Sequence, residues 1–122
     1  MEIDKEIIAK LKNILDKMRE EKNISLFIVI LREDSNVWDL VIGGRNLDTK
    51  ENLEWGVKII NKELDKDEVV LFSRLLLLNS DNPFVENINK SFRMPEGTVR
   101  IQNSKINNIA IKDAYLFYSK ME

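Results

Sequence analysis

The chain has 122 residues, a net charge of −2, and neither cysteine nor histidine. Without those two residue types it has no disulfides, no thiol or Ser-His-Asp nucleophile, and none of the commonest zinc ligands. We therefore predict no catalytic residues, no cofactor and no metal ion, and leave open whether the protein is an enzyme.

The length fits a single domain over residues 1–122. No apolar run is long enough to span a membrane, and the start, MEIDKEIIAK, is not typical of a signal peptide. We expect a cytoplasmic protein that does not bind membranes. Basic residues dominate residues 87–112, but only Phe92 there could stack on a base, so we do not expect a nucleic-acid partner.

A helix and a strand hairpin are predicted for the first third of the chain. Residues 4–22 repeat apolar residues at helical spacing, and Asp4 suits the N-cap. The continuous apolar run at residues 26–31 is typical of a strand covered on both faces. A short polar link joins it to a strand at residues 37–42, so we expect these two strands to be antiparallel.

Two glycines end the second strand and a second helix follows. We interpret Gly43 and Gly44 as a turn that needs positive φ. Asp48 and Glu51 have the spacing of a capping box and predict a helix that runs to about residue 66. The same loop could hold a phosphate on the first N–H groups of this helix. The cap carboxylate would compete for those groups, and no phosphate-binding motif is present.

The rest of the chain predicts a strand, a short helix and two closing strands. Residues 68–78 enter a third strand after a turn of helix at residues 67–70, and this strand is expected to be parallel to the second because a helix intervenes. A helix follows at residues 83–92, strands at residues 98–101 and 114–119, and an asparagine-rich loop at residues 103–108. The order α-β-β-α-β-α-β-β predicts an α+β fold: a single mixed β-sheet of about five strands with three helices.

The second helix has apolar residues on two faces. One stripe is expected to face the core: Leu53, Val57, Ile60 and Leu64. Trp55 and Ile59 fall near the opposite side, and we predict that they form an interface with a second copy or another protein. Gly56 weakens the helix by about 1 kcal/mol relative to alanine, so it indicates the close approach of another backbone.

Asp39 and Arg74 are lone charges inside apolar strands. They suit a structural ion pair, or a ligand site where Asp39, Ser73 and Arg74 converge and Arg45 adds a contact for a phosphoester. Such a site needs Asp39 and Arg74 on the same face of the sheet. A Mg²⁺-dependent version would use the carboxylates around the first hairpin, which are Glu33, Asp34, Asp39 and Asp48.

Four short motifs carry a resemblance to known proteins: WDLVI at 38–42, SRLLLL at 73–78, DNPF at 81–84 and AYLFYS at 114–119. Together they resemble a group of small uncharacterised prokaryotic α+β proteins. The resemblance implies a shared skeleton over the last two-thirds of the chain, and no activity, ligand or catalytic residue. We predict a non-catalytic binding or self-associating module, with the small-ligand or phosphoester site as the alternative.

Overall fold

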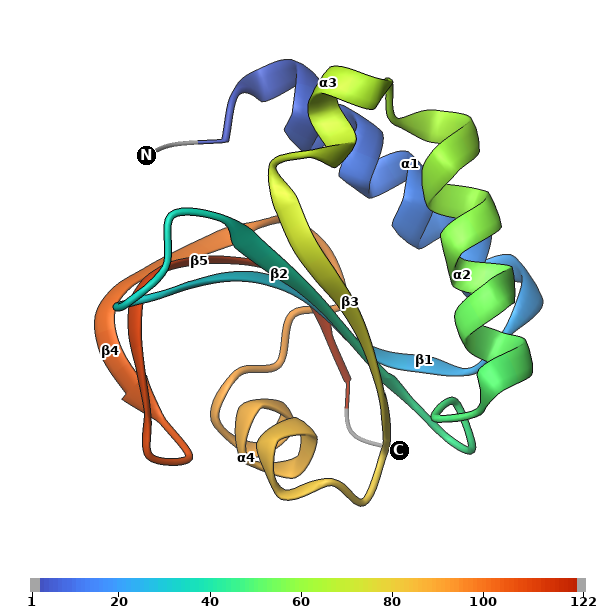
Figure 1. Cartoon of the computed structure of the whole chain (residues 1–122). Coiled ribbons are helices and arrows are strands. Elements are labelled where there is room, and N and C mark those ends of the chain that lie inside the picture. Colours follow the sequence, from blue (N-terminus) through green and yellow to red (C-terminus); the bar gives the residue numbers. More distant parts are fainter. Residues whose placement is uncertain (1–2, 121–122) are drawn as a thin grey trace.

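A mixed five-stranded sheet organises the chain (Figure 1). The computed structural model describes residues 3–120, whose strands are β1 (Ile24–Arg32), β2 (Trp38–Gly44), β3 (Phe72–Asn79), β4 (Val99–Ile106) and β5 (Ile109–Ser119). Their order in the sheet is β3-β2-β1-β5-β4, and only β2 and β3 are parallel. The helices of the described part are α1 (Lys5–Glu21), α2 (Lys50–Glu63), α3 (Lys66–Val69) and α4 (Pro83–Ser91).

The predicted α+β class and order of elements are confirmed, with one helix more than the three predicted. The additional helix, α3, is a single turn that leads into β3. Asp65 caps it, and the Glu68 carboxylate accepts a hydrogen bond from the Asp65 backbone N–H at 2.8 Å, so a capping box stabilises this turn.

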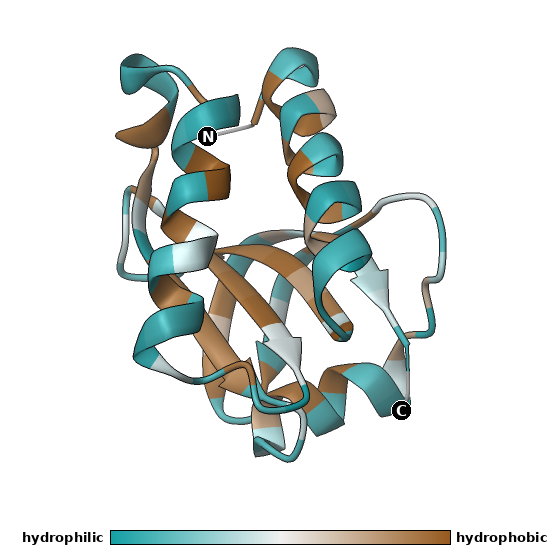
Figure 2. Cartoon of the chain, turned by 90° about the vertical axis from the view of Figure 1, so that its right-hand side faces the viewer, coloured by the Kyte–Doolittle hydropathy of each residue, from teal (hydrophilic) through white to brown (hydrophobic). Residues whose placement is uncertain are grey.

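The central strand β1 is buried on both faces, as its apolar run predicts. Phe27 and Val29 join a core with α1 and α2, whereas Leu26 and Ile28 join a second core with α4 on the opposite face. Figure 2 shows the hydrophobic strands between helices whose outer surfaces are hydrophilic. The sheet is therefore the middle of three layers.

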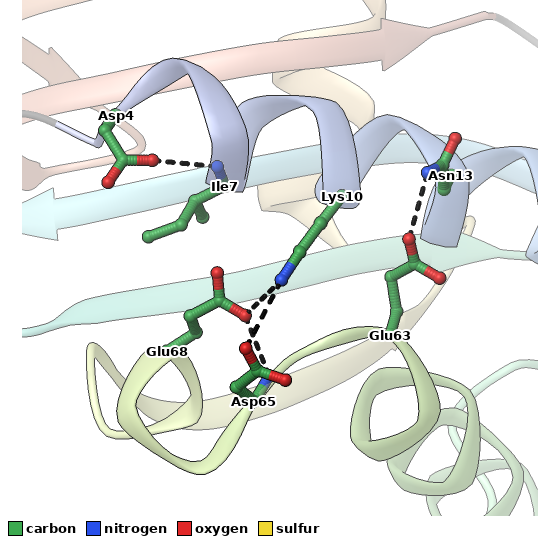
Figure 3. A network of polar contacts seen from close by, with 7 residues as sticks. All are labelled: Asp4, Ile7, Lys10, Asn13, Glu63, Asp65 and Glu68. Carbon is green, nitrogen blue, oxygen red and sulfur yellow. Dashed lines mark hydrogen bonds and ion pairs between the residues drawn. The ribbon is translucent and has the colours of Figure 1, made fainter.

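Polar contacts join α1 to the chain segment that leads out of α2 (Figure 3). Asp4 caps α1 by accepting a hydrogen bond from the Ile7 backbone N–H at 2.9 Å, as predicted. Lys10 Nζ lies 2.7 Å from Glu68 Oε1, and Asn13 donates to Glu63 Oε1 at 2.9 Å. These contacts set how α1 lies beside α2 and α3.

The two glycines at the end of β2 are not a turn with positive φ, so that prediction is wrong. Both belong to β2, and the positive φ falls on Asn46, at 55°. A Cβ on Gly43 would lie 2.9 Å from both methyl groups of Val85, and a Cβ on Gly44 would collide with the carbonyl oxygen of Asn23. The glycines are required because other parts of the chain come too close for a side chain.

The boundaries of two further elements differ from the predictions. The N-cap of α2 is Thr49, whose hydroxyl accepts from the Asn52 backbone N–H at 3.1 Å, and not Asp48. The predicted loop at residues 103–108 is mostly strand, because Asn107 and Asn108 alone form the turn between β4 and β5. Both have positive φ, 50° and 66°, which two-residue hairpin turns require and asparagine tolerates.

We expect Gly44→Ala to lower the free energy of unfolding by about 3 kcal/mol, because the added methyl group meets rigid backbone at Asn23. Gly56→Ala is the matched control. Its methyl group meets only the ends of side chains, of which Leu75 is the nearest at 3.0 Å, and the gain in helix propensity of about 1 kcal/mol offsets that contact. Urea denaturation measures both, and equal effects of the two substitutions would contradict this account.

Candidate functional site

A cluster of charged side chains surrounds Asp39 in the middle of β2. The parallel register pairs Asp39 with Arg74, and the Arg74 Nη2 donates to Asp39 Oδ2 at 3.1 Å. Ser73 Oγ donates to Asp39 Oδ1 at 2.8 Å. Arg32, at the end of β1, places its Nε 3.0 Å from Asp39 Oδ2. The structure therefore brings together three of the predicted site residues, Asp39, Ser73 and Arg74.

The cluster borders a cavity of about 260 Å³ on the face of the sheet that carries α4. Its walls are mainly aliphatic and aromatic side chains: Ile30, Val41, Leu76, Leu78, Phe84 and Ile109. Asn82, the N-cap of α4, and Asn107, in the β4–β5 turn, also line it. Asp39 and Arg74 line the same cavity and therefore lie on the same face of the sheet, as a ligand site that uses both residues requires.

The electrostatics of the cluster favour a charged Asp39. Burial by itself raises the pKa of this carboxyl. Hydrogen bonds from Arg74 and Ser73, together with the charges of Arg74 and Arg32, outweigh burial and hold the pKa of Asp39 below its ordinary value. The side chains of Arg32 and Arg74 remain 37% and 47% exposed, so two guanidinium groups face a single carboxylate beside the cavity.

Arg45 does not join this cluster. It lies beyond the end of β2 in a separate hollow of about 410 Å³ whose lining includes Arg19, Lys22 and Lys120. The guanidinium of Arg19 lies 4.3 Å from the ring centre of Tyr118 at this hollow. A single site that uses Asp39, Arg74 and Arg45 together is therefore not present, because β2 carries the chain away between Asp39 and Arg45.

Trp55 and Ile59 do not point away from the core, so the premise of the predicted interface is wrong. Both are half-buried and pack against the core that α1 shares, and Trp55 Nε1 donates to Glu21 Oε1 at 3.0 Å. Leu53 and Val57, which were expected in the core, are 41% and 42% exposed. The centre of the contact face is Gly56, which rests on Leu75 of β3. A helix can pack closely where its contact face is centred on glycine. The pattern of hydrophobic residues in the sequence does not identify such a face.

Arg32 belongs to the Asp39 cluster but is not among the residues predicted from the sequence. In the antiparallel hairpin, Ile30 pairs with Asp39, and Arg32 lies two residues further along the same face. The register of the β1–β2 hairpin could have identified it, because strand residues two apart share a face. Arg32 is followed directly by the polar link between the two strands, so the sequence pattern places it in that link and not in the strand.

The described residues contain no group of three or more carboxylates placed to hold a metal ion. The four carboxylates considered for Mg²⁺ around the first hairpin do not form such a group. Within residues 3–120, the helices are too short or too polar to cross a lipid bilayer.

Comparisons of the chain with protein-family models, curated proteins and solved structures found no match. The resemblance to small prokaryotic proteins stays a prediction. The candidate sites are therefore judged on the chemistry and geometry of this chain.

We expect Asp39→Asn to destabilise the protein by about 2 kcal/mol at pH 7, because two arginines lose their partner. Since the folded-state pKa of Asp39 is lowered, its stabilising contribution is present above the ordinary pKa of about 4 and is lost as the pH falls through the folded value. Unfolding curves at a series of pH values should therefore converge for wild type and variant at low pH. Asp34→Asn, in the exposed hairpin link, is the control and should change little.

Proposed function

We propose that the protein is a non-catalytic binding module that self-associates by pairing the β3 edge of one copy with the β3 edge of a second copy. The observation that carries this proposal is that β3 is an unprotected edge strand. Within residues 3–120 it has a neighbour on one side only, β2, so alternate backbone N–H and C=O groups along its eight residues have no strand of the described chain to pair with. A strand from another molecule satisfies such groups.

The two edges of the sheet differ in a way that supports this proposal. The other edge strand, β4, has the sequence VRIQNSKI, with exposed polar and charged residues and a positive φ at Asn103. Proteins commonly use such features to prevent edge-to-edge association. By contrast, β3 has four consecutive leucines (75–78), typical of a core strand, yet all four are only half-buried. Arg74 is its one charged residue.

The surface beside β3 extends the apolar area. Gly56 of α2 lies against Leu75, so α2 runs next to the edge strand. Leu53 and Val57, one turn before and one residue after Gly56, are the exposed large apolar residues of this helix. A second molecule paired with β3 would bring its own α2 beside this one and shield these side chains from water.

A second copy fits the edge better than an unrelated strand, because the pairing is self-complementary. Two antiparallel β3 strands are related by a two-fold axis perpendicular to the sheet, which is the closed, isologous arrangement most soluble dimers use. When the pairing is centred on Leu76, Arg74 lies opposite a leucine of the second copy and not opposite another arginine. Like charges therefore do not face each other across the interface.

We predict a light-scattering mass about twice the 14.3 kDa of one chain. The double variant Leu53→Glu/Val57→Glu should be a folded monomer by circular dichroism, because four carboxylates would meet at the interface. Lys58→Glu is the control. It changes the net charge by the same −2 on the same helix, but Lys58 lines the hollow between α1 and α2, and this variant should stay a dimer.

Hydrogen exchange locates the interface independently. The β3 amides that point away from β2 should be protected from exchange in the wild type and exchange faster in the double variant. The exchange rates of the β4 amides should be the same in both proteins. A wild type that stays monomeric at high concentration would refute the proposal. So would a dimer that the Leu53→Glu/Val57→Glu variant preserves.

A further inference from the structure

The cavity beside Asp39 has two chemically different parts. At one side lie the guanidinium groups of Arg32 and Arg74 with the carboxylate of Asp39 between them. The remaining walls are aliphatic and aromatic and come from β1, β2, β3, the start of α4 and the tip of the β4–β5 hairpin. A ligand that fills this cavity needs one polar end and one apolar body.

The charges at the polar side are not balanced. Two arginines contribute two positive charges, and Asp39 contributes one negative charge, so a charge of +1 remains. Asp39 is already satisfied, since it accepts hydrogen bonds from Ser73 and Arg74 and forms an ion pair with Arg32, whose Nε lies 3.0 Å from Oδ2 without hydrogen-bond geometry. Each guanidinium has five N–H donors, and only Arg74 Nη2 and Arg32 Nε contact Asp39. The remaining donors suit a second carboxylate, which would make the site neutral.

The walls and the volume of the cavity limit the kinds of ligand that it can hold. About 260 Å³ lies just below the usual range for drug-sized pockets, so the ligand is small. A phosphate group suits this cavity poorly, because a dianion would exceed the single unbalanced charge and the walls offer it few donors. The hollow at Arg45, with its four basic side chains, is the better place for a phosphate and serves as an internal comparison.

We infer that this cavity binds a small monocarboxylate with an apolar body, its carboxylate held by Arg32 and Arg74 and its hydrocarbon part by the walls. The inference does not depend on the dimer, because the cavity lies on the α4 face and all its lining residues belong to one chain. Asp39 acts here as a positioning residue that holds both arginines at the edge of the cavity.

Octanoate is the probe that tests the inference, titrated into the full chain and followed by calorimetry and by backbone amide NMR shifts. Octanol tests the need for the carboxylate, and inorganic phosphate tests the need for the apolar body. We expect saturable octanoate binding, with shifts confined to the lining residues. Octanol should bind at least ~10-fold more weakly, because a charge-assisted hydrogen bond is lost. Phosphate should not shift the lining residues.

Two variants and one control complete the experiment. Arg74→Gln should weaken octanoate binding at least ~10-fold. Since this substitution also leaves Asp39 with fewer partners, Ile109→Glu is a second variant. Ile109 is 40% exposed at the cavity wall and makes no hydrogen bond or ion pair in the Asp39 cluster, so the fold should persist while the new carboxylate opposes binding of the ligand's carboxylate. Arg45→Gln, in the separate hollow, should bind octanoate as wild type does.

The titration is repeated in Leu53→Glu/Val57→Glu, because Arg74, Leu76 and Leu78 belong to the β3 edge as well as to the cavity. Unchanged octanoate binding in this variant would show that the ligand site does not require self-association. Three outcomes would overturn the inference: no saturable octanoate binding to folded wild type, equal affinity for octanol, or a loss of binding in Arg45→Gln and not in Arg74→Gln or Ile109→Glu.

Discussion

The burial of β1 on both faces is the constraint on which the rest of the structure depends. A strand with apolar side chains on both sides needs a cover on each face, and α1 with α2 supplies one while α4 supplies the other. The helix α4 has only nine residues and cannot cover its whole face. The uncovered part, closed by the tip of the β4–β5 hairpin, is the cavity beside Asp39. The candidate ligand site is thus a consequence of unequal covers on the two faces.

Close packing around glycines decides how the layers meet. Gly43 and Gly44 let β2 pass under Val85 and beside the backbone at Asn23, and α2 lies with Gly56 against the Leu75 side chain of β3. The last contact bears on the proposed dimer, because it places Leu53 and Val57 beside the open edge of the sheet. The same edge strand provides one wall of the cavity through Leu76 and Leu78. The proposed dimer edge and the proposed ligand cavity therefore share β3, which offers its free backbone groups to the first and the side chains of Leu76 and Leu78 to the second.

The charged side chains within the apolar sheet also have to meet a requirement of the fold. Where charges are isolated in the apolar sheet, they are paired: Asp39 with Arg32 and Arg74, and Asp113 with Arg100 at 2.7 Å. Burying a carboxylate without partners would cost several kcal/mol, so some pairing was required for the fold to form. A second arginine beside Asp39 exceeds that requirement. This excess positive charge next to an apolar cavity distinguishes the Asp39 cluster from an ordinary structural ion pair and favours binding of a monocarboxylate.

The sequence predicts the order of elements, the α+β class and the two-sided burial of β1, because these depend on local periodicity and on turn residues. It also paired Asp39 with Arg74, since lone charges in apolar strands need partners. The three-dimensional structure was needed to establish which face of α2 is buried, because that face is centred on Gly56 and a pattern of hydrophobic residues does not identify it. It likewise placed Arg45 apart from Asp39, added Arg32, and left β3 at an edge. Register, strand order and close approach depend on contacts between residues far apart in the chain, and local sequence patterns do not encode those distances.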